Sequence, residues 1–233
     1  MIQDQRHISY STVTDEVIIG KYKALLAAKD FPCIAARAAL LKDQLTYMVA
    51  GHLACPLADN AILDFIYSFV EDYRKSSLPY HSAVVIFKHP LEIDEKVFDQ
   101  FMWQRLQSLA DKDSLRYHND KRVSAEPWSA HFSFSLKEEA FFIIGMHANS
   151  SRAARRFMFP TLVFNPHQQF TELRELNRYD KMKQVVRKRD IAFSGSINPT
   201  LEDFDEASEV YQYSGLKHDE HWKCPLNSRD AKT

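Results

Sequence analysis

The chain has 233 residues, of which 45% are hydrophobic and 26% charged, a composition typical of a globular protein with a sizeable core. Its formal net charge of −1 and the lack of any long apolar run exclude a general preference for nucleic acid or for a membrane. Cys33, Cys55 and Cys224 lie too far apart for a disulfide framework or a zinc site, and without a signal-peptide segment a cytoplasmic protein is expected.

Three helices are expected in the first third of the chain. Residues 15–29 place apolar side chains on one side at helical spacing, and Pro32 stops this helix because the residue before a proline disfavours the α conformation. Residues 35–50 are rich in alanine and leucine, which favours a second helix. Apolar residues recur every three or four positions over 59–74 and predict the third.

The pattern then changes to one typical of β-strands. Residues 82–87 form an apolar, β-branched run that predicts a buried strand, and Asp94 is a good N-cap for a helix after it. Residues 131–136 alternate strictly between an apolar and a polar side chain. Lys137-Glu138-Glu139 is typical of a tight turn, so residues 140–146 are expected to pair back as the second strand of a hairpin.

The last part of the chain returns to helical spacing. A strand is expected over 161–165, followed by one or two helices from Phe170 to Val186 and a stop at Gly195. Residues 196–227 contain few aliphatic side chains but keep several aromatic ones. We expect this segment to be an irregular, aromatic-rich arm laid over the body, since a disordered tail would be poorer in aromatics.

This order of elements predicts an α+β fold with a mostly antiparallel sheet flanked by helices. We expect a single domain over residues 1–233. Its parts would be N-terminal helices at 15–75, a sheet core at 81–165, and helices with the arm at 167–227.

The strand ending at Met146 delivers His147 to its end, which makes this histidine a candidate metal ligand. Its imidazole could hold a heme iron or a non-heme metal, although a hydrogen-bonded histidine at a strand end is the commoner case. No second histidine or carboxylate stands at ligand spacing from it, so a zinc or facial-triad iron site is not indicated. A heme remains open because it needs only one strong protein ligand.

Three arginines, Arg152, Arg155 and Arg156, follow His147 after a loop of small residues. Guanidinium groups bind carboxylates and phosphates with two parallel hydrogen bonds, so this turn is a candidate anion site. A solvated basic turn is the commoner alternative. If the turn is α-helical, Arg152 and Arg156 share a face and Arg155 diverges.

Two further features can carry chemistry. Cys33 and Cys224 are alternative iron ligands as thiolates, although a lone cysteine is more often a small buried apolar residue. The arm holds carboxylates that either form a solvated face or bind a cationic substrate such as a guanidinium, namely Glu202, Asp203, Asp205, Glu206 and Glu209. The chain contains no nucleophile elbow, P-loop or dinucleotide-binding glycine motif.

A set of short motifs follows in a fixed order along the chain. The first half of the set comprises Phe31-Pro32-Cys33, Phe132-Ser133-Phe134-Ser135, Glu138-Glu139-Ala140-Phe141-Phe142, Gly145-Met146-His147, Ser150-Ser151-Arg152 and Pro160-Thr161-Leu162-Val163. The second half comprises Arg187-Lys188-Arg189-Asp190, Gly195-Ser196-Ile197-Asn198-Pro199, Ser208-Glu209, Gln212-Tyr213-Ser214-Gly215 and Trp222-Lys223-Cys224-Pro225. Together they resemble the YqcI/YcgG-like family, and within it the heme-dependent N-hydroxylase branch.

The resemblance implies a protein that binds heme b. It would use O₂ and electrons from a reductase or a ferredoxin to hydroxylate a nitrogen of a guanidine- or amine-bearing amino acid or similar small molecule. Neither nucleic acid nor a membrane is expected as a partner, and a homodimer is compatible with the pattern.

Carried over by position, the resemblance also assigns residues. His147 would be the axial iron ligand, with Cys33 or Cys224 as the alternatives. The cofactor pocket would be formed by Arg152, Arg155, Arg156, Phe142, Met146 and Cys33. The substrate would meet Glu209, Gln212 and Tyr213.

Two departures from the family pattern bear on these assignments. Ile34-Ala35-Ala36-Arg37 follows Cys33 where a glycine is expected, and Leu216 stands where an arginine is expected. The second departure lies in the arm, so it affects the substrate more than the cofactor. The alternatives are a non-catalytic protein that binds or senses heme, and a heme-free module that binds an anion or a partner protein.

Overall fold

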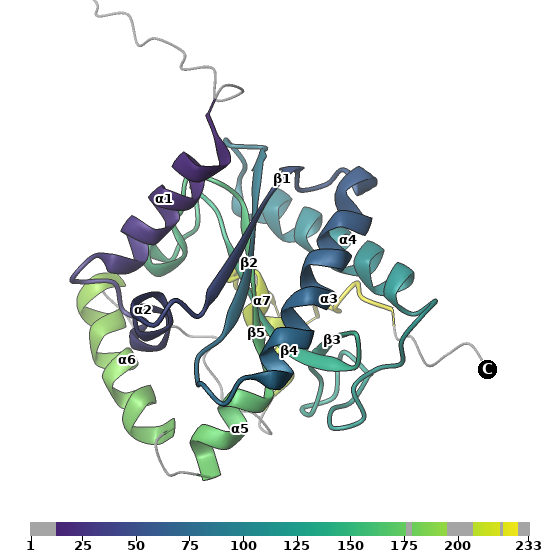
Figure 1. Ribbon diagram of the computed structural model, residues 1–233. Helices are drawn as coiled ribbons and strands as arrows, with labels where there is room; N and C mark the ends of the chain where they lie inside the picture. The colour runs from purple at the N-terminus through teal and green to yellow at the C-terminus, as the bar shows by residue number, and fades with distance from the viewer. Residues whose placement is uncertain (1–12, 176–178, 195–206, 220, 228–233) are drawn as a thin grey trace, which may run out of the picture.

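The computed structural model describes residues 13–175, 179–194, 207–219 and 221–227, and its centre is a five-stranded sheet (Figure 1). The strands lie in the order β1-β2-β5-β4-β3, with bounds Leu45–His52 (β1), Ser82–His89 (β2), Phe134–Leu136 (β3), Glu139–Met146 (β4) and Thr161–Pro166 (β5). Only the β1–β2 pair is parallel, and the pairs β2–β5, β5–β4 and β4–β3 are antiparallel. The predicted α+β fold with a mostly antiparallel sheet is therefore confirmed.

The expected helix over residues 35–50 is wrong in its second half. Helix α2 covers only Ile34–Leu41, Asp43 turns the chain with a φ of 55°, and β1 begins at Leu45. The alanine-rich start raised the helix propensity of the whole segment, but Thr46, Tyr47 and Val49 favour a strand. Helix α3, Asp59–Lys75, then provides the crossover that a parallel β1–β2 pair requires.

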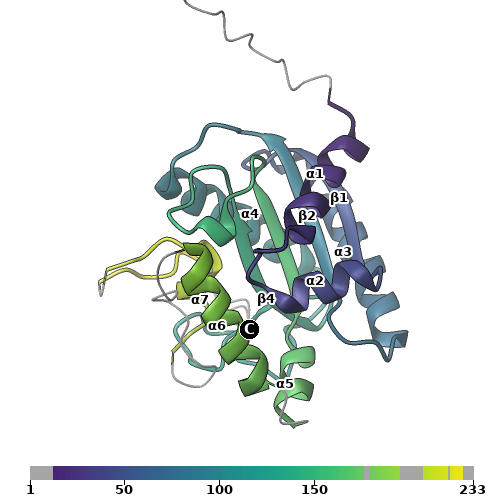
Figure 2. The ribbon, with the colours of Figure 1, turned by 90° about the vertical axis from the view of Figure 1, so that its left-hand side faces the viewer.

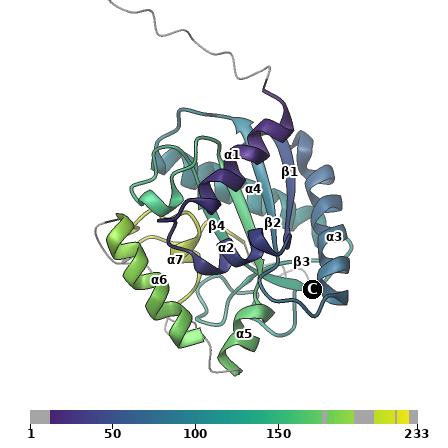
Figure 3. The same ribbon diagram turned by 60° about the vertical axis from the view of Figure 1, so that its left-hand side comes forward.

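Helices cover both faces of the sheet (Figures 1 and 3). One face carries α3 and α4, Glu95–Asp113, and the other carries α1, Asp15–Ala27, with α2 and α6, Tyr179–Ser194. Helix α5, Gln168–Glu175, follows β5 directly. As expected, Asp94 caps α4, its Oδ1 accepting a hydrogen bond from the Val97 backbone N–H at 2.8 Å. Within the described ranges, no helix is long and apolar enough to span a membrane.

The predicted hairpin is present, with Lys137 and Glu138 at φ values of 52° and 55° in the turn. Its first strand is shorter than expected, because β3 pairs only with residues 139–141 of β4. Helix α7, Val210–Tyr213, packs against β4 beyond that point. Part of the predicted arm is thus helical, whereas Gly195 and the carboxylates at 202–206 lie outside the described residues.

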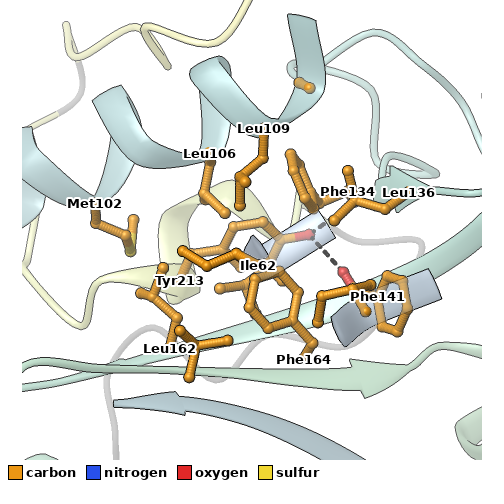
Figure 4. Packing of buried hydrophobic residues seen from close by; sticks show 14 of the residues in the cluster. Ile62, Met102, Leu106, Leu109, Phe134, Leu136, Phe141, Leu162, Phe164 and Tyr213 are labelled. Carbon is orange, nitrogen blue, oxygen red and sulfur yellow. Dashed lines mark hydrogen bonds between the residues drawn. The ribbon is translucent and has the colours of Figure 1, made fainter. Parts of the chain in front are cut away.

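Two hydrophobic clusters fill the space on either side of the sheet. Leu106 and Leu109 of α4 pack on Phe134, Phe141 and other residues of the first cluster (Figure 4). The Tyr213 hydroxyl lies 3.2 Å from the Phe141 carbonyl, which fixes α7 to the sheet within this cluster (Figure 4). The second cluster lies under α1 and α2 and contains Ile18, Tyr22, Leu26, Phe31, Met146 and Val163.

Candidate functional site

A cavity of about 290 Å³ lies on the α1/α2 face of the sheet, between the strands and the helices α1, α2, α5, α6 and α7. Figure 2 shows α1, α2 and α6 in front of the sheet. Most of the lining is apolar or aromatic, including Tyr22, Phe142, Ile144, Met146, Phe170, Tyr179, Met182 and Val186. An apolar cavity with a few polar groups is the usual form of a small-molecule or cofactor site. Phe142, Met146 and Cys33, all expected in the cofactor pocket, line it.

Cys33 lies at the cavity as the N-cap residue of α2. Its Sγ accepts a hydrogen bond from the Ala36 backbone N–H at 3.4 Å. Burial raises the pKa of the Cys33 thiol, while the N–H groups of Ala36 and Ala35 act in the opposite direction. The backbone donors offset only part of the effect of burial, so the pKa of Cys33 stays raised, and the thiol would lose its proton on binding a metal. Cys55 and Cys224 do not line this cavity.

A buried carboxylate, Glu209, lines the cavity next to α7. Its Oε2 accepts a hydrogen bond from the Ser133 hydroxyl at 2.9 Å and lies 3.1 Å from the Tyr213 hydroxyl. The Nε2 of His167, also buried and also lining the cavity, is 3.3 Å from Glu209 Oε1. Glu209 and Gln212 thus stand where a ligand can reach them. Tyr213 does not line the cavity and instead helps to hold Glu209 in place.

His167 was not identified from the sequence, although a signal for it exists. Val163, Asn165 and His167 all line the cavity, so they continue the period of two along and just beyond β5. The sequence did not show which face of the strand would meet a cavity, and Pro166 separates the histidine from the apolar run. The period of two therefore pointed to His167, but the sequence offered no reason to prefer this face of the strand over the other.

The three arginines of the turn have three different environments. Arg152 is buried and its Nη2 forms an ion pair with Asp190 Oδ2 of α6. Arg155 is buried and donates to the Gln212 and Tyr213 carbonyls of α7, at 2.6 and 2.7 Å. Arg156 is exposed and donates to the carbonyls of Ser150 and Ser151. Arg152 and Arg155 line the cavity and Arg156 does not.

The condition under which Arg152 and Arg156 would share a face, an α-helical turn, is not met. Residues 153–155 form a 3-10 turn with Arg152 as its extended N-cap residue. Arg152 and Arg155 both line the cavity and so lie on the same side. Burial, followed by the neighbouring Arg152 charge, lowers the pKa of Arg155 to about 10. Three other cations of α5 and α6 line the cavity, namely Arg174, Lys183 and Arg187.

His147 lies on the other face of the sheet from the cavity. Its ring is fully buried and stacks on Phe98 of α4, with the ring centroids 4.4 Å apart. Side chains alternate along β4, so Met146 faces the cavity and His147 faces α4. Neither ring nitrogen has a hydrogen-bond partner of normal geometry among the described residues, although the Ile93 backbone lies close. Burial lowers the pKa of His147, so the ring is neutral. The backbone of His147 pairs with Arg155 and Arg156, but its ring does not reach the cavity that most of the other predicted site residues line.

The residues that the structure describes contain no group of three or more His, Cys, Asp or Glu side chains that could hold a metal ion. The model of the YqcI/YcgG family matches residues 22–227. The chain belongs to the YqcI/YcgG family.

Two proteins of Bacillus subtilis (strain 168), YcgG and YqcI, are similar to this chain over most of their length. YcgG is 26% identical over 216 residues, which cover 88% of this chain and 79% of the relative. YqcI is 28% identical over 206 residues, which cover 84% and 80%. Both are described as uncharacterized, so they carry no activity to this chain. No solved structure matches the chain.

The family match spans the whole cavity, from Tyr22 in α1 to Gln212 in α7. One glycine of this region has a direct structural reason. Gly215 has a φ of 85°, and a Cβ placed on it would stand 2.8 Å from Cδ of Arg155. The turn after α7 thus needs glycine both for its backbone conformation and for the close approach of Arg155.

Proposed function

We propose that this protein is a heme-dependent oxygenase that hydroxylates a nitrogen of a guanidine- or amine-bearing small molecule. The observation that carries the proposal is the position of Cys33. It combines a helix N-cap, a backbone N–H donor to the sulfur and access to an apolar cavity. A cysteine thiolate in such a setting is a known axial ligand of heme iron in oxygen-activating proteins.

The residues of the cavity fit a heme in three respects. Cys33 offers a sulfur ligand, the aromatic and aliphatic walls suit a flat apolar ring, and Arg174, Lys183 and Arg187 suit its carboxylate groups. His147 does not fit, because its ring is enclosed on the other face of the sheet. We therefore assign Cys33 as the residue that would hold the iron, whereas Arg152 and Arg155 serve to fix α6 and α7.

When bound, the heme supplies the activation of O₂, with electrons from an external donor. The chain's own residues bind and orient the substrate. Glu209 is the carboxylate that accepts N–H hydrogen bonds from a cationic nitrogen group, and Ser133 and Tyr213 fix its second oxygen. His167 Nε2 stands 3.3 Å from Glu209 Oε1, where it can accept or return a proton as the substrate nitrogen is deprotonated. The largely apolar lining strengthens the electrostatic interactions of this pair.

Turnover by heme-loaded protein tests the proposal. The protein is incubated with O₂, a reducing system and free arginine as the probe, and mass spectrometry detects a product with one added oxygen on nitrogen. Glu209→Gln keeps the shape of the side chain but removes its charge, so we expect KM to rise by about 10- to 100-fold, the worth of one charge-assisted hydrogen bond. Glu175→Gln, an exposed carboxylate on α5, is the matched control and should change KM less than twofold.

The outcome also separates the alternatives. A protein that binds heme without turning over any guanidine or amine probe is a heme-binding or sensing protein. A protein that takes up no heme at all, when produced with sufficient iron, is a heme-free binding module. Either result contradicts the proposal.

A further inference from the structure

The helices on the two faces of the sheet differ in the charge that they expose. Residues 15–43, which run through α1 and α2, contain five basic and four acidic side chains, and all nine are exposed or half-buried. Residues 183–190 of α6 contain four basic and one acidic, and that one, Asp190, is buried and paired with Arg152. On the other side of the sheet, α3 and α4 contain five acidic and four basic side chains that are exposed or half-buried, because Asp59, Asp99, Asp113 and Arg105 are buried. The side with α1, α2 and α6 therefore exposes a net positive charge, whereas the exposed charges of α3 and α4 nearly balance.

Helices α1, α2 and α6 lie side by side on one side of the molecule (Figures 2 and 3). The basic face is the set of cations on these helices and on the residues that follow α1 and α2. Its members are exposed or half-buried and do not line the cavity: Lys21, Lys23, Lys29, Arg37, Lys42, Lys188 and Arg189. Exposed apolar side chains stand among them on α2 and α6, with Leu41 84% exposed and Val185 and Ile191 43% each. A mixture of cations and scattered apolar residues is typical of a transient protein-binding surface.

The basic face is built around the loop that leads into Cys33. The Arg189 guanidinium of α6 donates to the Phe31 carbonyl at 3.0 Å and also to the Lys29 carbonyl. The Arg37 Nη1 of α2 donates to the same Lys29 carbonyl at 3.2 Å. These contacts hold α6 and α2 against the backbone at Lys29 and Phe31, two residues before Cys33. The surface just outside the proposed ligand is therefore both positive and fixed.

We propose that the basic face is the docking surface for an acidic electron-transfer protein, which delivers electrons on the Cys33 side of the cavity. This inference rests on the proposed function, because an oxygenase of this kind requires an external donor. Charge complementarity is the reason to expect an acidic partner. Opposite electrostatic potentials steer two proteins together and raise their association rate by about 10- to 1,000-fold.

The test reverses two exposed charges of the basic face, in the variant Lys29→Glu/Lys188→Glu. Lys75→Glu on α3 is the matched control, and the Lys75 side chain is 75% exposed. The probe is an acidic [2Fe–2S] ferredoxin. Its binding is measured by titration at low and at moderate ionic strength, with heme-free protein as well as heme-loaded protein. Stopped-flow absorbance then follows reduction of the bound iron by the ferredoxin and, in parallel, by dithionite.

We expect the double variant to bind ferredoxin at least about tenfold more weakly and to lose most of the salt dependence. The control should stay within twofold of the parent protein, and reduction by dithionite should be the same in all three. Equal ferredoxin binding by the double variant and the parent overturns the inference. Binding of RNA or anionic lipid vesicles through these lysines, without binding of ferredoxin, also overturns it. Failure of the proposed function is distinguishable, because it removes heme uptake or turnover but leaves the binding titration with heme-free protein interpretable.

Discussion

Arg155 provides a sharp test of whether the arginine turn is a structural clamp or a cofactor clamp. Its guanidinium is buried and donates to the Gln212 and Tyr213 carbonyls at 2.6 and 2.7 Å. These carbonyls belong to the end of α7, whose start carries Glu209 at the cavity. The substitution Arg155→Met keeps most of the volume and removes the donors. We expect it to destabilise the heme-free protein and to loosen Glu209.

The magnitude follows from the hydrogen bonds. Two bonds from a charged donor are worth about 1.5–3 kcal/mol each, which gives about 3–6 kcal/mol. Part of this is offset, because the variant no longer buries a guanidinium, and the same burial lowers the pKa of Arg155 to about 10. We expect the free energy of unfolding to fall by about 2–4 kcal/mol, which a domain of ordinary stability survives.

Urea unfolding of heme-free protein measures this loss, and the neighbouring Arg156→Met is the matched control. Arg156 is exposed and donates only to surface carbonyls, so we expect its replacement to cost less than about 1 kcal/mol. The substrate KM of heme-loaded Arg155→Met should rise because α7 is less fixed. Unchanged stability of heme-free Arg155→Met, with weakened heme binding, would instead show that Arg155 contacts the cofactor and would refute this reasoning.

Three further predictions concern single residues. Gly215→Ala places a Cβ at a φ of 85° and 2.8 Å from Arg155 Cδ, so it should lower the free energy of unfolding by about 1–3 kcal/mol; unfolding indistinguishable from the parent would contradict the close approach. Asp190→Asn removes the carboxylate that pairs with Arg152 and should lower the free energy of unfolding by about 3 kcal/mol in urea, whereas a loss under about 1 kcal/mol would show that other groups stabilise the Arg152 charge. Burial lowers the pKa of His147 in the folded protein below its unfolded value of about 6.5. As the pH falls below that value, the unfolded chain takes up a proton that the folded protein does not, so the folded state loses stability. Between about pH 7 and pH 5, His147→Leu should therefore lose less stability than the parent, by up to about 1.4 kcal/mol per pH unit, and parallel curves would exclude a buried neutral histidine.

Much of the fold could be predicted because local signals agreed with the final packing. Asp94 caps α4, the 137–139 turn makes the hairpin, and the apolar runs at 82–87 and 161–165 are strands. Strand β1 was missed because an alanine-rich helix runs into it with only three residues between them. The sequence carried opposing propensities there, and pairing with β2 decided the outcome.

The sequence could predict several residues that line the cavity, but it could not predict on which face of the sheet the cavity lies. The period of two along a strand predicts that Met146 and His147 lie on opposite faces of the sheet, but it does not predict which face borders the cavity. That depends on how α5, α6 and α7 return to the sheet, which is a long-range property. The pairing of the arginines depended on a local detail that the sequence left open, since Arg152 and Arg156 would share a face only in an α-helix and residues 153–155 form a 3-10 turn.

The central claim is that Cys33 is the axial ligand of a bound heme, and the ferrous, CO-bound absorption spectrum tests it most directly. Thiolate and imidazole ligation give Soret bands at different positions in this state. We predict a thiolate-type band for the parent protein and for His147→Leu, and loss of that band in Cys33→Ser. An imidazole-type band in the parent that survives in Cys33→Ser and disappears in His147→Leu would contradict the account.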